Sequence, residues 1–162
     1  MVNIKQLLGS GKLSRINELE IDRYLEFFSM SSYDNLEHCK FVLEKFPRWS
    51  IISGYYAMHD SAKLFLAKNF MLKVEYKVHA TTIQTLKETL TDPELISMMQ
   101  DGYSEFISLA NDLATGKKER VKAQYYTGTK YMKKEYSGFA QGFLKNTVQP
   151  FLKKITALGD DK

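Results

Sequence analysis

Apolar residues recur at steps of three and four along most of this chain, a spacing that places them on one face of an α-helix. The strongest pattern predicts a helix from Trp49 to Asn69. Its apolar stripe consists of Ile51, Tyr55, Met58, Ala62 and Phe65. A second clear pattern predicts a last helix, whose stripe consists of Met132, Tyr136, Phe139, Phe143, Thr147, Phe151 and Ile155. No stretch alternates apolar with polar residues for long enough to indicate a sheet.

Two further helices are expected before Trp49. The first begins at Ile21. Ser31 and Asp34 match a variant of the capping box, so they predict that a second helix starts there, and Pro47 should end it. Segment 70–76 is the best candidate for a strand, but it is isolated, so we expect a connector.

Signals after residue 78 delimit the remaining helices. A short helix is expected over 79–90. Asp92 followed by Pro93 predicts the start of a long helix, because proline is tolerated at the first helical position. Gly116 is expected to stop that helix, and Pro150 to kink the last helix or end it early.

These patterns predict an all-α protein, specifically an antiparallel up-and-down bundle of five to six helices. A length of 162 residues fits one domain, and no repeat or long linker divides the sequence. We therefore expect a single domain over 1–162, with an N-terminal extension helix within 1–30 and the bundle over about 33–155.

The composition is that of a folded chain that needs no cross-link. Hydrophobic residues make up 44% of it, and a chain of this length buries roughly two-thirds of its unfolded surface. Cys39 is the single cysteine, so we expect neither an intramolecular disulfide nor a zinc site. Because no membrane span or signal peptide is apparent, we expect a cytoplasmic protein without a cofactor.

Positive charge is concentrated between Lys117 and Glu135. This segment holds seven basic and two acidic residues, a net charge of +5, whereas the whole chain carries +4. A basic strip with interleaved tyrosines can follow a phosphate backbone. A solvated lysine-rich helix end fits the same pattern equally well.

Three histidines are the candidates for acid–base chemistry, since no complete phosphate-binding, nucleophile-elbow or zinc-protease motif is present. His38 is expected on a polar surface. His59 falls at the edge of the central apolar stripe, where a hydrogen-bonded packing role is favoured. His79 opens a helix after a lysine-rich connector. Neighbouring lysines should lower the pKa of His79, which suits a neutral general base, although a helix-start residue bonded to backbone is the simpler interpretation.

Three short elements carry a resemblance to a known family. The run from Ser53 to Ala67, which includes Tyr-Tyr-Ala-Met at 55–58, resembles the central helix of HEPN domains (higher eukaryotes and prokaryotes nucleotide-binding). Lys77-Val78-His79 resembles the Lys-Thr-His opening of the family's next helix. Arg120 with Gln124-Tyr125-Tyr126 resembles an Arg-x-x-Ala-Asp-Tyr element before the last helix. The resemblance covers about residues 33 to 155.

The resemblance implies a helical bundle of four or five helices that is usually a homodimer. Many HEPN domains are toxin ribonucleases or partners of a nucleotidyltransferase-type antitoxin. Catalytic members carry an arginine shortly before a histidine and need no metal. Their histidine acts as acid or base while the RNA 2′-hydroxyl attacks the neighbouring phosphate, and their arginine stabilises the transition state.

The sequence departs from the catalytic pattern, because no arginine lies within the six residues before His79. Lys73 occupies the comparable place, but lysine lacks the planar fork of arginine. His59 stands where the central helix usually has an aromatic residue. The candidate catalytic pair is therefore His79 with Lys73. The candidate nucleotide- or RNA-binding residues are Lys77, Arg120, Tyr125 and His59.

Three hypotheses follow. The first is a dimeric HEPN-type module that binds nucleotide, RNA or a nucleotidyltransferase-type partner in a toxin–antitoxin setting. The second is an active metal-independent ribonuclease that uses His79 with a nearby basic residue. The third is a non-catalytic helical adaptor whose basic strip is only a solvated face.

Overall fold

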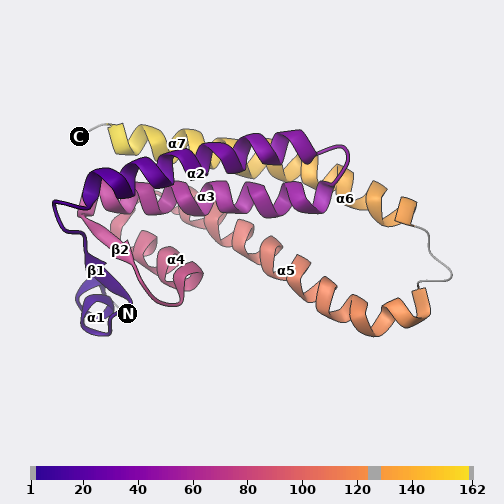
Figure 1. The fold of residues 1–162 in the computed structure, drawn as a ribbon, viewed down its shortest axis with the longest axis horizontal. Coiled ribbons are helices and arrows are strands. Elements are labelled where there is room, and N and C mark those ends of the chain that lie inside the picture. The colour runs from indigo at the N-terminus through magenta and orange to yellow at the C-terminus, as the bar shows by residue number, and fades with distance from the viewer. Residues whose placement is uncertain (1–2, 124–128, 161–162) are drawn as a thin grey trace.

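The computed structural model describes the backbone of residues 3–123 and 129–160 and the side chains of residues 3–109 and 136–160. The elements in chain order are α1 (Ile4–Gly9), β1 (Leu13–Arg15), α2 (Ile21–Val42), α3 (Pro47–Phe70), β2 (Leu72–Val74), α4 (Val78–Thr89), α5 (Pro93–Ala123), α6 (Thr129–Phe143), the π-helix η1 (Leu144–Val148) and α7 (Gln149–Asp160). Figure 1 shows α2, α3, α6 and α7 running along one another, α5 running obliquely away from them, and α1 and the two strands at one end. The predicted all-α helical bundle is confirmed. Within the described ranges, no helix is both long and apolar enough to cross a membrane.

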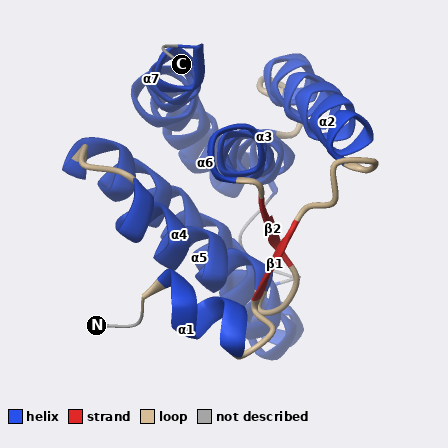
Figure 2. Cartoon of the chain, turned by 90° about the vertical axis from the view of Figure 1, so that its left-hand side faces the viewer, coloured by secondary structure: helices blue, strands red, loops and turns tan. Residues whose placement is uncertain are grey.

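α3 is the central helix of the bundle. In Figure 2, which looks along the bundle, α2 and α7 lie on either side of α3 and α4 and α5 lie below it, and α3 contacts all four helices as well as α6. Fifteen of its 24 residues are buried, including the whole predicted apolar stripe. Full burial of one large apolar side chain stabilises a fold by about 1.5–3 kcal/mol. Packing on α3 therefore holds the bundle together.

α2 is one continuous helix, so the prediction of two helices divided at Ser31 is wrong. The Ser31 hydroxyl donates to Asp60 Oδ2 at 2.7 Å, and the Ser32 hydroxyl donates to a backbone carbonyl of α3 at 3.0 Å. Both side chains thus bond to the neighbouring helix instead of capping a helix start. α2 ends at Val42, and Pro47 is the first residue of α3, where its missing N–H costs nothing.

β1 and β2 pair as an antiparallel two-stranded sheet, with Leu13 opposite Val74 and Arg15 opposite Leu72. The expectation of an unpaired connector over 70–76 is therefore wrong. The expected N-terminal extension helix is also only partly present, because α1 and β1 precede α2. The partner strands are far apart in the sequence, so no local hairpin signal announces them.

The predicted start of α5 is confirmed, and its predicted end is wrong. The Asp92 carboxylate accepts hydrogen bonds from the backbone N–H groups of Glu94 at 2.9 Å and Leu95 at 3.4 Å. α5 then continues past Gly116 to Ala123. A single interior glycine costs about 1 kcal/mol relative to alanine, and the surrounding helix-forming residues offset that cost.

The disturbance expected at Pro150 takes the form of the π-helix η1. The N–H of Gln149 donates to the carbonyl of Leu144, five residues back, where an α-helix would bond four residues back. Proline has no N–H for the α-helical bond, and its ring clashes with the preceding turn of a regular α-helix. The chain therefore stays helical through Pro150 by changing its helix type.

We predict that Gly54→Ala destabilises the bundle. A Cβ at Gly54 would lie 2.9 Å from Cγ2 of Val148 and 3.2 Å from Sγ of Cys39, and both of these side chains are buried. Overpacking of this kind costs about 1–3 kcal/mol, which exceeds the gain from replacing a helical glycine. Urea unfolding followed by circular dichroism measures the difference.

The matched control is Gly138→Ala on α6, where an added Cβ would meet nothing within 4 Å. This variant should be as stable as the natural chain or more stable by up to about 1 kcal/mol. If both alanine variants unfold at the same urea concentration, α3 does not approach η1 and α2 as closely as described.

Candidate functional site

His79 lies in the first turn of α4 and faces α3. Lys77 is the residue before the helix and adopts a left-handed conformation, with φ 48° and ψ 51°. The N–H of Thr81 donates to the carbonyl of Lys77 at 2.9 Å, and its hydroxyl donates to the carbonyl of Tyr76 at 2.7 Å. These bonds fix the turn and so fix the direction in which the His79 imidazole points.

Aromatic rings from α3 and α5 surround the half-buried imidazole of His79. Tyr103 stacks on it, with ring centroids 5.7 Å apart and planes inclined by 18°. The other rings lie 4.7–6.0 Å away by centroid and belong to Tyr55, Tyr56, His59 and Phe106. We call these six residues the His79 cluster. The cluster brings α3, α4 and α5 together around the imidazole of His79.

Tyr55 holds the imidazole by a hydrogen bond of 2.8 Å between its hydroxyl and Nδ1 of His79. Burial raises the pKa of Tyr55 far above its ordinary value, so the phenol stays neutral. Among the described residues, Nδ1 of His79 is the only acceptor within reach of that hydroxyl. The phenol therefore donates to Nδ1, and the neutral imidazole carries its proton on Nε2.

The cluster keeps His79 uncharged at neutral pH. Burial lowers its pKa to about 4, and the positive charge of Lys63 acts in the same direction. A neutral imidazole can donate from Nε2 or stack on a flat ligand. With a pKa this low it is a weak general base at neutral pH.

His59 is buried beneath His79, with 1% of its surface exposed. Thr82 donates its hydroxyl proton to the carbonyl of Val78 at 2.8 Å, so the same hydroxyl accepts from Nε2 of His59 at 3.2 Å. Among the described residues the bare Nδ1 has no hydrogen-bond partner, and it lies 3.9 Å from Oδ1 of Asp60. Burial lowers the pKa of His59. Its influence on any ligand must therefore pass through His79.

The predicted lysines occupy different places. Lys77 is exposed beside the start of α4, with Nζ 5.9 Å from the ring centroid of Tyr76. Lys73 alternates with the buried Leu72 and Val74 on β2, and its Nζ lies 3.4 Å from a carboxylate oxygen of Glu75. Lys73 makes no contact with His79 among the described residues. Arg120 and Tyr125 lie outside the residues whose side chains are described.

Sequence reasoning gave no site role to four members of the cluster, Tyr55, Tyr56, Tyr103 and Phe106, or to the nearby Lys63. Tyr103 and Phe106 come from α5, three residues apart on one helix face, a spacing that signals a shared surface. Lys63 lies one turn after His59 on α3, and its Nζ is 4.7 Å from the ring centroid of Phe28. Partial burial lowers the pKa of Lys63, and its charge acts on both histidines.

A groove of about 320 Å³ runs along the stacked side of the cluster, between α4 and α5. Its lining residues are Ile83, Gln100, Tyr103, Ser104 and Ile107. Tyr103 belongs to both the groove and the cluster. The ring that stacks on His79 is therefore also part of the groove wall.

Comparison with protein-family models, with curated proteins and with solved structures gave no match. Within the described residues, no three His, Cys, Asp or Glu side chains form a group that could hold a metal ion. The side chains of the site are therefore the basis for inferring its chemistry.

We predict that the chain loses stability as the pH falls from about 6.5 toward 4. The unfolded chain binds a proton at His79 near pH 6.5, whereas the folded chain does so only near pH 4. Protonation over this interval therefore favours the unfolded state. Urea midpoints measured across it should fall steadily with pH, and His79→Gln should reduce the slope.

The matched control is His38→Gln, which removes an exposed histidine on α2 outside the cluster. This variant should keep the pH dependence of the natural chain. An equally steep pH dependence in His79→Gln would mean that the burial of His79 does not set the acid response.

Proposed function

We propose that this chain is a dimeric, cytoplasmic HEPN-type module that binds single-stranded RNA or a nucleotide at the start of α4. The observation that supports this most is the placement of a neutral, ring-stacked His79 at a helix start that no described side chain caps. A nucleotide has an anionic phosphate and a flat base. The first turn of α4 suits the phosphate, and the groove along Tyr103 suits the base.

The phosphate side of the site is the first turn of α4. The first intrahelical acceptor is the carbonyl of Lys77, so the N–H groups of residues 78–80 have no helical partner. Free N–H groups and the helix dipole favour an anion at this position. Lys77 adds a positive charge at the same end, and Nε2 of His79 adds a donor.

The base side of the site is the groove along Tyr103. Bases stack on tyrosine and histidine rings with little dependence on sequence, and each such contact contributes about 1–3 kcal/mol. Gln100 and Ser104 provide amide and hydroxyl groups at the groove edge. A base in the groove would contact Tyr103, the ring that stacks on His79.

Binding is favoured over catalysis for two reasons. A histidine with a pKa of about 4 is a poor base at neutral pH. Lys73, the candidate partner, is engaged by Glu75 and has no described contact with His79. The active ribonuclease stays the alternative, with Lys77 or Lys63 as the nearby cation, and cleavage of the RNA used in the binding assay distinguishes it.

The outer face of α2 supports the proposed dimer. Phe27, Met30, Tyr33 and Phe41 are 59–85% exposed on this helix. Exposed apolar patches of this kind mark interaction surfaces. Of the aromatic residues on α3 and α6, Tyr55, Phe65 and Phe143 are buried within the chain itself, whereas Trp49 and Phe139 are exposed. A nucleotidyltransferase-type partner is the alternative occupant of the α2 face.

We predict that Tyr103→Ala weakens binding of a fluorescein-labelled single-stranded RNA about fivefold to 100-fold, because a stacking surface is lost. Lys77→Ala should reduce the slope of log affinity against log salt by about one unit, because one phosphate contact is lost. Fluorescence anisotropy at several salt concentrations measures both effects. Lys87→Ala, an exposed lysine near the other end of α4, is the control and should bind as the natural chain does.

If neither Tyr103→Ala nor Lys77→Ala affects RNA binding, the proposal of an RNA site at α4 is wrong and the adaptor hypothesis is retained. Cleavage of the RNA that disappears in His79→Ala would replace the binding proposal by the ribonuclease. Binding without cleavage, lost in the Tyr103 variant, is the outcome that we expect.

We predict a homodimer through α2, so Phe41→Asp should yield a monomer. The side chain of Phe41 is 85% exposed in the single chain, and a carboxylate there would have to be desolvated in the interface. Light scattering at micromolar concentration measures the mass. Leu158→Asp, which alters a less exposed apolar residue on α7, should leave the dimer intact, and a natural chain that is monomeric would contradict the prediction.

A further inference from the structure

A second groove lies on the opposite side of α5, facing α6 and η1, and has a volume of about 400 Å³. Its residues on α5 are Asp101 and Glu105. With 3.6 residues per turn, these two point away from the helix face that carries Tyr103. The groove is therefore separate from the His79 cluster and is not part of the proposed RNA site.

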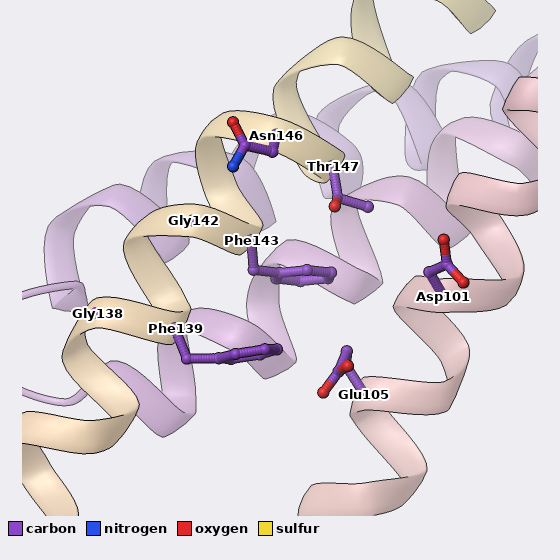
Figure 3. Close-up of a pocket in the computed structure, with 8 residues that line it drawn as sticks. All are labelled: Asp101, Glu105, Gly138, Phe139, Gly142, Phe143, Asn146 and Thr147. Carbon is purple, nitrogen blue, oxygen red and sulfur yellow. The ribbon is translucent and has the colours of Figure 1, made fainter.

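The α6 wall of this groove is aromatic and open. Figure 3 shows the rings of Phe139 and Phe143 extending from α6 toward α5, with Glu105 extending back toward them. The two rings are nearly parallel, at 10°, with centroids 6.4 Å apart. Phe143 is buried, whereas Phe139 is 43% exposed, and Gly138 and Gly142 put no side chain over the same stretch of helix, so the ring of Phe139 is the one open to a ligand.

The α5 wall of the groove carries two carboxylates. Neither Asp101 nor Glu105 forms an ion pair among the described residues, and the groove lining contains no basic residue. Burial and the neighbouring Asp101 carboxylate raise the pKa of Glu105, so a cation in the groove would relieve both effects. Aromatic faces also attract cations through their ring quadrupole. Both walls therefore favour the same kind of ligand.

We infer that the groove between α5 and α6 binds the guanidinium group of an arginine side chain presented by a partner polypeptide. A guanidinium stacks flat on an aromatic ring while its fork donates to a carboxylate, and an ammonium cannot do both. The volume exceeds that of one guanidinium and leaves room for the aliphatic stem of arginine. Asn146 and Thr147 line the rest of the groove and can bond to the adjoining peptide backbone.

The test uses the full chain labelled with ¹⁵N and a blocked pentapeptide with one central arginine between glycines. Titration followed by amide shifts should perturb residues of α5 and α6 around the groove and reach saturation in the millimolar range. The same peptide with citrulline keeps the shape of arginine but not its charge, and the same peptide with lysine keeps the charge but not the fork. Both should bind at least about tenfold more weakly, the loss expected for one charge-assisted hydrogen bond.

Two variants locate the binding. Glu105→Gln should weaken the arginine peptide about tenfold. Phe139→Leu should weaken it several-fold, and Phe139 is 43% exposed, so the fold tolerates the change. Glu26→Gln on the exposed side of α2 is the control and should have no effect. Circular dichroism verifies that every variant remains helical.

Equal binding of the citrulline peptide, or shifts confined to other helices, would overturn the inference. Absence of any saturable response to the arginine peptide would also overturn it. Tighter binding of free spermidine than of the arginine peptide would replace the proposed partner by a small polyamine. Each of these results is independent of RNA binding at α4.

Discussion

Buried polar side chains on α3 have to find partners on the helices around it, and that requirement sets how the bundle assembles. The hydroxyl of Ser50 donates to the carbonyl of Cys39 at 2.7 Å, and Ser61 shares a hydrogen bond of 2.6 Å with Ser32. Asp60 accepts from Ser31 at 2.7 Å. A buried polar group without its partner costs about 1–3 kcal/mol, so sliding α2 along α3 is unfavourable at each contact. Apolar packing supplies the stability, and these bonds select one alignment.

The same requirement creates the candidate site. On the other side of α3, Tyr55 and His59 face α4, and their polar atoms meet His79 and Thr82. The bond from Tyr55 places the imidazole against Tyr103, and burial of the cluster keeps it neutral. The packing of the core and the arrangement of the candidate site therefore depend on one set of contacts. Within the described part of the chain, Nδ1 of His59 is the one buried side-chain polar atom that has no hydrogen-bond partner.

Periodicity and local caps were sufficient for features that depend on nearby residues. The buried stripe of α3 and the Asp92 cap are examples, because each is written into a few consecutive turns. The prediction of a helix start at Ser31 was wrong, because its hydroxyl bonds to Asp60, 29 positions away, and does not cap a local helix. The prediction for Lys73 also failed because tertiary structure places the residue. Its proximity to His79 in sequence suggested a catalytic pair, but the pairing of β2 with β1 puts alternate residues on opposite faces of the strand. Tyr103 joined the site only through the packing of α5.

The protonation state of His79 is the most direct test of whether the cluster keeps this imidazole neutral and fixes its tautomer. In a chain labelled with ¹⁵N at histidine, nuclear magnetic resonance distinguishes the two ring nitrogens and follows them with pH. We expect a proton on Nε2, an unprotonated Nδ1 that accepts from the hydroxyl of Tyr55, and a titration midpoint near pH 4. A midpoint close to the ordinary value of about 6.5, or a proton on Nδ1 at neutral pH, would contradict this expectation.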